Sequence, residues 1–294
     1  LEKQLSYWKQ QLGGKLPVVE LPTDNPRPPK KSYRGASLFF RMPKDMTASV
    51  RNLSKKEGST LFMVLLTAFK CLLHRYTGQT DIIIGSPISG RTDIRTEDMI
   101  GMFVNTLPLR SDLSGDPSFT DVLNQVRKTA LEAYEHQHLP FQKIVEALNP
   151  IRTAGYNPFF QVMFVLENAP VPELDLPNLE ASAVDVDKNT SIADLVLYIW
   201  DEPEGLRTRL EYDTELFHEA TARRIAEHFE ILLAHIVEHP EKRISQFPLV
   251  SEAEGNRMLL DWNATGAEYP REATIHSLFE SQVERTPDAV AVIF

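Results

Sequence analysis

Apolar residues along the chain alternate between helical and strand spacing, without a strict repeat. Spacings of three and four predict helices over residues 1–12, 45–56, 59–76, 118–133, 141–148, 219–237 and 274–283. Short β-branched or aromatic runs predict strands over residues 36–42, 81–84, 104–110, 159–166, 193–200, 206–212 and 289–294. Helices and strands interleaved in this way predict a layered α/β or α+β body with a mixed β-sheet flanked by helices.

Several segments carry local signals of their own. Five prolines within residues 17–31 exclude helix and central strand and predict an extended crossing segment. Gly85 to Gly90 is interpreted as a tight turn, and Pro108 confines the later half of its strand to an edge or a bulge. Residues 241–270 are polar and are expected to form loops. The helix at 59–76, with Ser59 as its cap, is apolar on nearly every face, so we expect Cys71 to be a core residue.

Composition narrows the classes of protein. The 294 residues are 42% hydrophobic, enough for a substantial core, and the net charge of -10 argues against nucleic-acid and anionic-membrane partners. One cysteine allows no disulfide framework, which favours a reducing cytoplasm. The longest apolar run, residues 61–73, is interrupted by Lys70 and is too short to span a bilayer.

Generic catalytic motifs give no complete set. His235-Ile-Val-Glu-His239 matches the H-x-x-E-H zinc pattern and makes a metallopeptidase a competing hypothesis, but Pro240 disfavours helical geometry at His239. The sequence has no G-x-S-x-G elbow, no dinucleotide or P-loop motif and no Cys/His cluster, so no metal or directly bound cofactor is expected. His136 and His138 are candidate general bases without an evident partner.

Three ordered segments, however, resemble a known family. Residues 100–110, IGMFVNTLPLR, are similar to the fifth core motif of condensation domains from nonribosomal peptide synthetases. Residues 136–146, HQHLPFQKIVE, resemble the sixth motif, and Arg152 through NPFFQVMF at 157–164 resembles the seventh. The likeness covers residues 1 to 250, and WNAT at 262–265 with RTPDAVAV at 285–292 looks like the linker and opening of an adenylation domain.

The resemblance implies a chloramphenicol acetyltransferase-like fold, in which two lobes form a V and carrier-bound 4'-phosphopantetheine arms enter a tunnel between them. This chain would be the C-terminal lobe (1–245), a linker (246–268) and an N-terminal fragment of the adenylation domain (269–294). Its partners would be the N-terminal lobe, the donor and acceptor carrier domains and the adenylation domain. The family's His-His-x-x-x-Asp-Gly signature belongs to the preceding lobe and is absent here. We therefore expect both ends to be truncated and the fragment to be inactive alone.

The family reaction forms an amide from a carrier-bound thioester and a carrier-bound amine. By the resemblance, Asn157 is the catalytic candidate, as an oxyanion or positioning group, and the substrate-binding candidates are Asn105, Gln161 and Arg91. Each also has a structural interpretation: Asn157 can shape a loop before Pro158, Asn105 can satisfy buried backbone groups, and Arg91 can pair with a carboxylate.

Two further sets of polar residues stay outside this catalytic set. Asp194 is interpreted as a half-buried polar residue at the cleft. Arg27, Lys30 and Lys31 could contact an acidic carrier, although solvation of a proline-rich loop is the favoured interpretation. An epimerization-domain lobe is an alternative, over which GMFVNT at 101–106 and the adenylation-like tail favour condensation. A non-catalytic carrier-docking module remains a further alternative.

Overall fold

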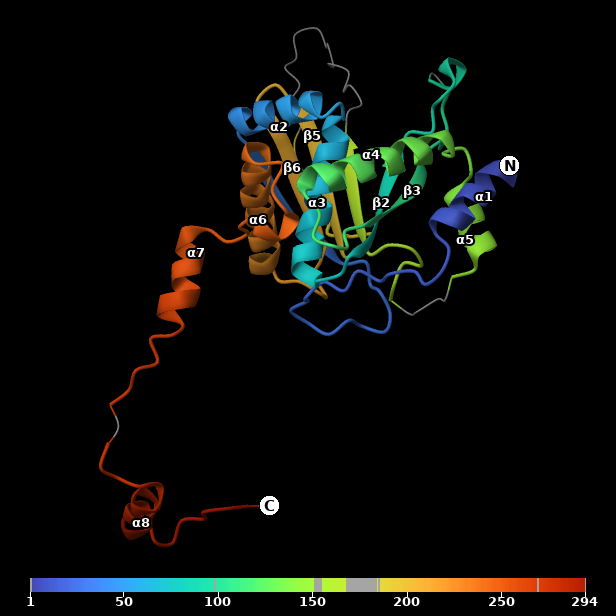
Figure 1. Cartoon of the computed structure of the whole chain (residues 1–294). Coiled ribbons are helices and arrows are strands. Elements are labelled where there is room, and N and C mark those ends of the chain that lie inside the picture. The colour runs from blue at the N-terminus through green and yellow to red at the C-terminus, as the bar shows by residue number, and fades with distance from the viewer. Residues whose placement is uncertain are drawn as a thin grey trace, which may run out of the picture. The chain divides into compact units, whose positions relative to one another are not determined.

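A six-stranded mixed sheet forms the centre of the fold (Figure 1). The computed structural model describes residues 2–97, 99–150, 155–167, 184, 186–268 and 270–293. The strands are β1 (Gly35–Met42), β2 (Asp81–Ile88), β3 (Asn105–Asp112), β4 (Val162–Glu167), β5 (Leu195–Glu202) and β6 (Gly205–Asp213), in the order β1-β6-β5-β4-β2-β3. The pairs β2–β4 and β4–β5 are parallel, and the other neighbours are antiparallel. The predicted mixed sheet is confirmed.

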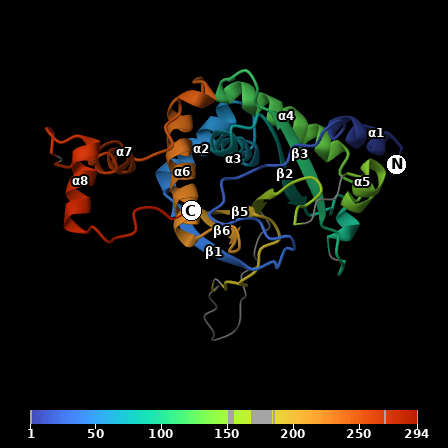
Figure 2. The ribbon, with the colours of Figure 1, turned by 90° about the horizontal axis from the view of Figure 1, so that it is seen from below.

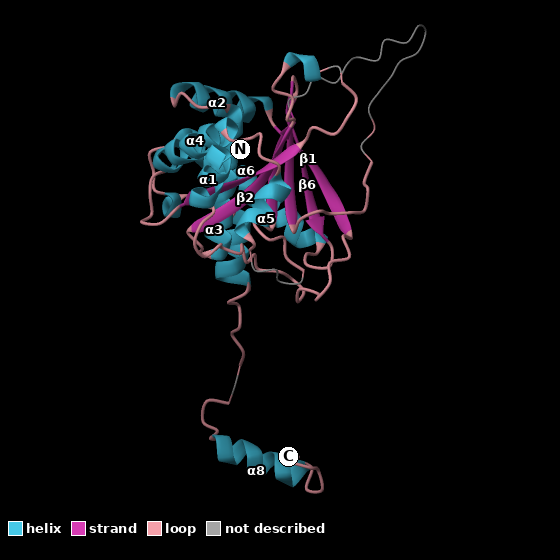
Figure 3. Ribbon diagram, turned by 90° about the vertical axis from the view of Figure 1, so that its right-hand side faces the viewer, coloured by secondary structure: helices cyan, strands magenta, loops and turns pink. Residues whose placement is uncertain are grey.

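Helices cover one face of this sheet, as the view in Figure 3 shows. The longer helices are α1 (Glu2–Gln11), α2 (Lys44–Lys56), α3 (Leu61–Thr77), α4 (Phe119–Glu135), α5 (Phe141–Leu148), α6 (Glu219–Glu238) and α8 (Ile275–Arg285). Shorter helical turns are η1 (Ile94–Thr96), η2 (Ile244–Gln246), α7 (Glu252–Asn256) and η3 (Arg257–Asp261). Against the sheet, α3 packs on β2, α4 on β3, and α2 and α6 on β6. The seven predicted helices are confirmed to within two residues at each end.

Helix α3 is the centre of the hydrophobic core. Every residue from Met63 to Leu73 is buried, which confirms that this helix is covered on all sides. Thr60, rather than Ser59, caps it by accepting a hydrogen bond from the backbone N–H of Met63 at 3.2 Å. Cys71 is a core residue as predicted, and burial raises the pKa of its thiol to about 12.

Helix length and hydropathy together decide whether a helix can span a lipid bilayer. Within the described part of the chain, no single helix is both long and apolar enough to cross a membrane. Helices α2 and α3 reach the length and apolar composition of a membrane span only when they are taken together, and the chain bends by 105° between them.

The structure corrects the predicted turn at Gly85 to Gly90. Residues Gly85 to Ile88 continue β2 instead, paired with β3 on one side. A glycine is needed in this strand because a Cβ atom on Gly85 would lie 2.5 Å from the ring of Phe160. Pro108 lies opposite Gly85 on β3, which is the last strand of the sheet, so its prediction as an edge residue is confirmed.

Two predictions near the C-terminus are also wrong. Residues 252–261, expected to be a loop, form α7 and η3, because Ser251 caps α7 by accepting a hydrogen bond from the N–H of Glu254 at 3.1 Å. Residues 289–293, expected to be a strand, are described and carry no strand. An apolar run forms a stable strand only beside a pairing partner, and the described residues offer none there.

The chain divides into two compact units, residues 1–249 and residues 250–294. The sheet and the helices α1 to α6 belong to the first unit. In it, residues 13–33, all described, form neither helix nor strand, which confirms the extended proline-rich segment. Figure 2 shows α1 beside α5, close to β3 at the edge of the sheet.

Candidate functional site

The three segments that carry the family resemblance meet in space beside the end of the sheet. Asn105 begins β3, residues 136–140 form the turn between α4 and α5, and residues 157–161 lead into β4. We call these three segments the motif cluster. Its contacts explain which of the predicted site residues are free to meet a substrate.

Asn105 is the amide that joins the first two segments. Its Nδ2 donates hydrogen bonds to the carbonyl oxygens of Gln137 and Leu139, both at 2.9 Å. Its Oδ1 accepts a hydrogen bond from the backbone N–H of Phe141, also at 2.9 Å. Both Nδ2 hydrogens and the carbonyl oxygen are therefore committed to the backbone of the turn between α4 and α5.

Asn157 shapes the third segment. Its Oδ1 accepts the N–H of Phe159 at 3.1 Å and, more weakly, that of Phe160 at 3.5 Å, so the side chain closes a local turn. This turn delays the start of β4 to Val162, three residues later than the predicted strand. Within the described residues, the Nδ2 of Asn157 makes no hydrogen bond, and the residue is partly exposed.

Gln161 lies beneath Asn157 and is 2% exposed. Its Nε2 donates to the carbonyl oxygen of Asn157 at 3.1 Å, and its Oε1 accepts the N–H of Val19 at 2.8 Å. Gln161 thus ties the proline-rich segment to the motif cluster. The side chain is therefore buried and hydrogen-bonded to the backbone through both its Nε2 and its Oε1.

Aromatic rings fill the space between the second and third segments. Phe141 meets Phe159 and Phe160, each with ring centroids 5.7 Å apart. Phe160 in turn covers Gly85 of β2. These contacts fix the motif cluster against the sheet through packing rather than through charge.

Arg91 lies in the loop between β2 and β3. Its guanidinium donates hydrogen bonds to the carbonyl oxygens of Thr96, of Glu97 at 3.4 Å and of Gly101 at 3.3 Å. It also stacks over Phe103, with the guanidinium carbon 4.4 Å from the ring centroid. Among the described residues, Arg91 therefore pairs with carbonyl oxygens and an aromatic face, and not with the carboxylate that its structural interpretation anticipated.

Two adjoining cavities open beside the motif cluster, and both are lined by Val104 and Gln137. The larger cavity has a volume of about 670 Å³ and apolar walls that include Phe62, Ile88 and Leu166. The smaller cavity, of about 270 Å³, is lined by polar groups that include Asn105, His138 and Gln142. We refer to them as the large and the small cavity.

The turn between α4 and α5 is the wall that the two cavities share. Gln137 reaches both, and its Nε2 donates to the carbonyl oxygen of Tyr134, a further residue of the large cavity, at 2.8 Å. Sequence reasoning missed Gln137 and Tyr134. The only sequence signal for them was their position within and just before the sixth motif.

The two histidines considered as general bases, His136 and His138, lie in different surroundings. His136 donates from Nδ1 to the carbonyl oxygen of Glu132 at 2.8 Å, and its ring stacks on Tyr7 with centroids 4.2 Å apart. His138 is exposed at the small cavity. Ser86, near the end of β2, is 2% exposed, and its hydroxyl donates a hydrogen bond to the carbonyl oxygen of Phe164. It is therefore not positioned to act as a nucleophile.

The zinc-peptidase pattern also lacks its geometry. His239 is the cap residue after α6, with φ -138° and ψ 58°, so the two histidines are not held at i and i+4 of one helix. Among the described residues, no group of three or more His, Cys, Asp or Glu side chains is arranged to hold a metal ion.

A second polar assembly, which we call the charge network, consists of Arg27, Lys31, Asp194 and Asp213. Arg27 forms a bidentate pair with Asp194, and the Nζ of Lys31 lies 3.6 Å from Asp194 and 3.9 Å from Asp213. Both carboxylates are at most 3% exposed, and burial raises the pKa of Asp213.

The charge network corrects two interpretations. Asp194 is fully buried rather than half-buried, and Arg27 and Lys31 are partners of carboxylates rather than merely solvated; only Lys30 of the three is exposed. The side chain of Arg27 also lies 4.1 Å from the ring centroid of Tyr156, next to Asn157. The network thus anchors the proline-rich segment beside the motif cluster.

The motif cluster provides hydrogen-bond donors beside two cavities. Among its described residues, no nucleophile is in contact with a base. Asn157 is partly exposed, and its Nδ2 donates no hydrogen bond to another described residue. Such a surface can position and stabilise a reacting group.

Comparisons with known proteins agree with this description. The chain is 43% identical to a linear gramicidin synthase of Brevibacillus parabrevis over 295 aligned positions, which cover all of this chain and 6% of that protein. It is 40% identical to a plipastatin synthase of Bacillus subtilis (strain 168), covering 99% of this chain and 11% of that protein. The chain thus spans only a small part of the curated relatives that it matches.

Solved structures show the same fold. The four-domain nonribosomal peptide synthetase AB3403, bound to AMP and glycine, matches 98% of this chain and 23% of its own, with a TM-score of 0.83 and 24% identity. The X-domain from teicoplanin biosynthesis matches 85% of this chain and 57% of its own, with a TM-score of 0.77 and 27% identity. The family model described as "Condensation domain" matches residues 1–259. The chain therefore belongs to the condensation-domain family of nonribosomal peptide synthetases.

Proposed function

We propose that residues 1–245 are the C-terminal lobe of a condensation domain that joins a carrier-bound acyl or peptidyl thioester to a carrier-bound aminoacyl amine. Residues 246–268 would be the linker and residues 269–294 the start of an adenylation domain. The partners would be an N-terminal lobe and two carrier domains that present 4'-phosphopantetheine arms. The observation that carries this proposal is that the three family segments meet beside two cavities, and that the third segment holds the partly exposed amide of Asn157.

The reaction proposed for the two lobes balances without a cofactor bound by this chain. The amine nitrogen attacks the thioester carbonyl carbon, the carbon–nitrogen bond forms, and the carbon–sulfur bond breaks. The amine proton leaves through a base, and the departing sulfur takes up a proton as the free thiol. Negative charge gathers on the carbonyl oxygen in between, so a hydrogen-bond donor fixed at that position accelerates the step.

Asn157 is the best donor of the four candidates. Its Oδ1 accepts hydrogen bonds from the N–H groups of Phe159 and Phe160, which holds the amide group in place, and its Nδ2 has no partner among the described residues. Both Nδ2 hydrogens of Asn105 are already donated to backbone carbonyl oxygens, and Gln161 is buried. The guanidinium of Arg91 donates to carbonyl oxygens of its own loop. We assign these three the role of holding the walls of the site.

The loop between β2 and β3 supports a two-lobe arrangement. Figure 1 shows η1 projecting from the body in this loop. Ile100 and Met102 are almost fully exposed, and Ile94 is 78% exposed. Exposed apolar side chains so close together favour burial against another protein surface. We assign that surface to the N-terminal lobe.

The base is expected from that lobe as well. The sequence contains no His-His pair and no Asp-Gly pair, so the family's signature is not in this chain. We therefore expect the isolated chain to make no amide from loaded carriers. Product formation by the isolated chain would contradict this division of the reaction between lobes.

The sharpest test uses two substitutions at Asn157 in the full-length protein. Asn157→Asp keeps an oxygen at the Oδ1 position, and therefore the turn, but removes the Nδ2 donor. Removing one oxyanion donor typically lowers kcat by about 100-fold or more. We expect that loss of amide formation from loaded carriers with an unchanged melting temperature, and Asn157→Gln is the variant that retains a donor on a longer side chain. Unchanged kcat in Asn157→Asp would remove Asn157 from the reaction.

A further inference from the structure

Helix α1 contacts the turn that forms the shared wall of the two cavities. The indole Nε1 of Trp8 donates a hydrogen bond to the carbonyl oxygen of His136 at 3.1 Å. The ring of Tyr7 lies parallel to the ring of His136, with 12° between the planes and 4.2 Å between the centroids. The next residue, Gln137, lines both cavities.

The turn is therefore held by contacts with two different elements, β3 and α1. Asn105 holds the carbonyl oxygens of Gln137 and Leu139 from β3, while α1 holds His136 from the opposite end of the turn. Trp8 is fully buried, so its position is fixed by the core. A shift of α1 along its axis would move His136, and with it the Gln137 side chain at the cavity wall.

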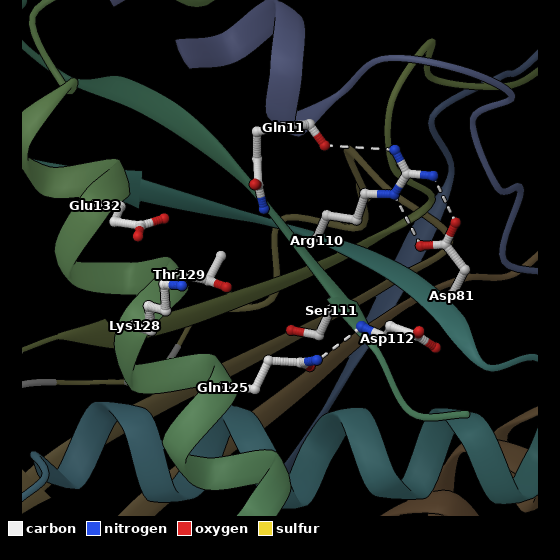
Figure 4. Close-up of a pocket in the computed structure, with 9 residues that line it drawn as sticks. All are labelled: Gln11, Asp81, Arg110, Ser111, Asp112, Gln125, Lys128, Thr129 and Glu132. Atoms are coloured by element: carbon white, nitrogen blue, oxygen red, sulfur yellow. Dashed lines mark hydrogen bonds and ion pairs between the residues drawn. The ribbon is translucent and has the colours of Figure 1, made fainter. Parts of the chain in front are cut away.

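Arg110 fixes α1 at its other end. The guanidinium forms a bidentate pair with Asp81, with hydrogen bonds of 2.9 and 2.7 Å, and donates to the carbonyl oxygens of Gln11, Gly13 and Lys15. Figure 4 shows Arg110 between Asp81 and Gln11. A cation at the C-terminal end of a helix is favourable because the last carbonyl groups carry partial negative charge.

We propose that α1 is a positioning element for the reaction, which sets the width of the cavities by holding the His136–Leu139 turn through Tyr7 and Trp8 and is anchored by Arg110. This inference rests on the proposed function. It adds that selectivity for the size of the carrier-bound substrate depends on a helix that touches neither cavity directly.

The chain offers a matched pair of variants. Tyr7→Leu removes the ring that stacks on His136. Tyr7→Phe keeps the ring and removes only the hydroxyl, which has no hydrogen-bond partner within the described residues. The two variants therefore separate ring stacking from the loss of a polar group.

The measurement is a competition in the full-length protein between acceptor carriers loaded with a large and a small amino acid. The product ratio does not depend on how much of the protein is folded, so loss of stability alone leaves it unchanged. Displacement of a positioning group typically changes rates by about tenfold or more. We expect Tyr7→Leu to shift the ratio by that order, whereas Tyr7→Phe keeps the wild-type ratio.

Each outcome decides the inference. An unchanged ratio in Tyr7→Leu overturns it, whatever happens to the melting temperature. If Tyr7→Leu fails to fold, the same product ratio is measured in Trp8→Phe, which removes the Nε1 hydrogen bond to His136 and keeps an aromatic ring in the core. An unchanged ratio in that variant overturns the inference. Wild-type protein that makes no amide at all contradicts the proposed function and the inference with it, whereas active wild type with unaltered variants contradicts the inference alone.

Discussion

The motif cluster and the charge network both join segments that are distant in the sequence, but the first does so with neutral amides and the second with charged side chains. The motif cluster uses neutral amides, Asn105, Asn157 and Gln161, each bonded to backbone groups. The charge network uses the buried carboxylates of Asp194 and Asp213 with Arg27 and Lys31. A neutral amide is less costly to bury and does not titrate, whereas a buried charge depends on its partner. The three amides that hold the site residues therefore carry no charge that a change of pH could alter.

The largest expected effect comes from breaking the charge network. Asp194→Asn preserves the shape of the side chain but leaves Arg27 without its carboxylate, and we expect the free energy of unfolding to fall by about 3 kcal/mol. Urea denaturation measures it. Lys30→Gln, at an exposed neighbour of the network, is the matched control and should leave the midpoint unchanged. A loss in Asp194→Asn no larger than in this control would mean that the network does not anchor the proline-rich segment.

Breaking the motif cluster should have a smaller effect. Asn105→Ala leaves the carbonyl oxygens of Gln137 and Leu139 and the N–H of Phe141 without their partner, at an expected loss of about 2 kcal/mol. Asn105→Asp retains the acceptor but turns a carboxylate oxygen toward the carbonyl oxygens of Gln137 and Leu139, so its loss should be at least as large as that of Asn105→Ala. If Asn105→Ala were as stable as wild type, water would have replaced the amide and the cluster would be less rigid than described.

Lys70 extends this comparison to a buried charge that has no carboxylate in contact among the described residues. It is fully buried in α3, and its Nζ donates to the carbonyl oxygen of Leu109 at 2.7 Å and to the Oγ of Ser111 at 2.8 Å. Burial lowers the pKa of Lys70 to about 7. The folded state therefore disfavours the ammonium form, so stability falls as the pH drops from the ordinary lysine pKa towards 7.

The resulting experiment follows the stability of the chain from pH 7 to pH 8.5. We expect the free energy of unfolding to rise by about 1–2 kcal/mol over this interval. The interval ends there because the raised pKa of Cys71 acts in the opposite direction once the unfolded thiol ionises. Lys70→Met should flatten the dependence, and an identical slope in that variant would show that Lys70 is not its source.

The smallest effect is expected at Arg91, a charged residue outside both assemblies. Its hydrogen bonds to Glu97 and Gly101 belong to an exposed loop. Arg91→Met should therefore change the free energy of unfolding by only about 0.5 kcal/mol, while the loop becomes easier to cleave by protease. A loss as large as that of Asn105→Ala would place Arg91 in the core architecture after all.

Local patterns predicted most of the fold. Helix α4 was visible from its capping box at Ser118 and from its apolar stripe, and both are present. The strand from Gly85 to Ile88 could not be predicted, because Gly, Ser and Pro indicate a turn. Only the tertiary structure shows that the ring of Phe160 lies against this strand. The helical turns after Ser251 were missed because the segment is polar and lacks a continuous apolar stripe.

The site was less predictable than the fold. The family resemblance pointed to Asn105, Asn157, Gln161 and Arg91, but sequence positions do not reveal which side-chain N–H groups are already hydrogen-bonded to the backbone. Likewise, Arg27 and Asp194 are 167 residues apart, so no local pattern joins them. Hydrogen bonding across the tertiary structure decides which polar residue remains free for a ligand.

The outer edge of β3 has one more consequence. Pro108 offers no backbone N–H, the side-chain oxygen of Gln125 occupies the N–H of Asp112, and Arg110 holds residues 11–15 alongside. An open strand edge recruits other strands, and here the chain's own residues block that growth. These side chains therefore close the β3 edge of the sheet to further strands, which disfavours edge-to-edge pairing with another copy at this edge.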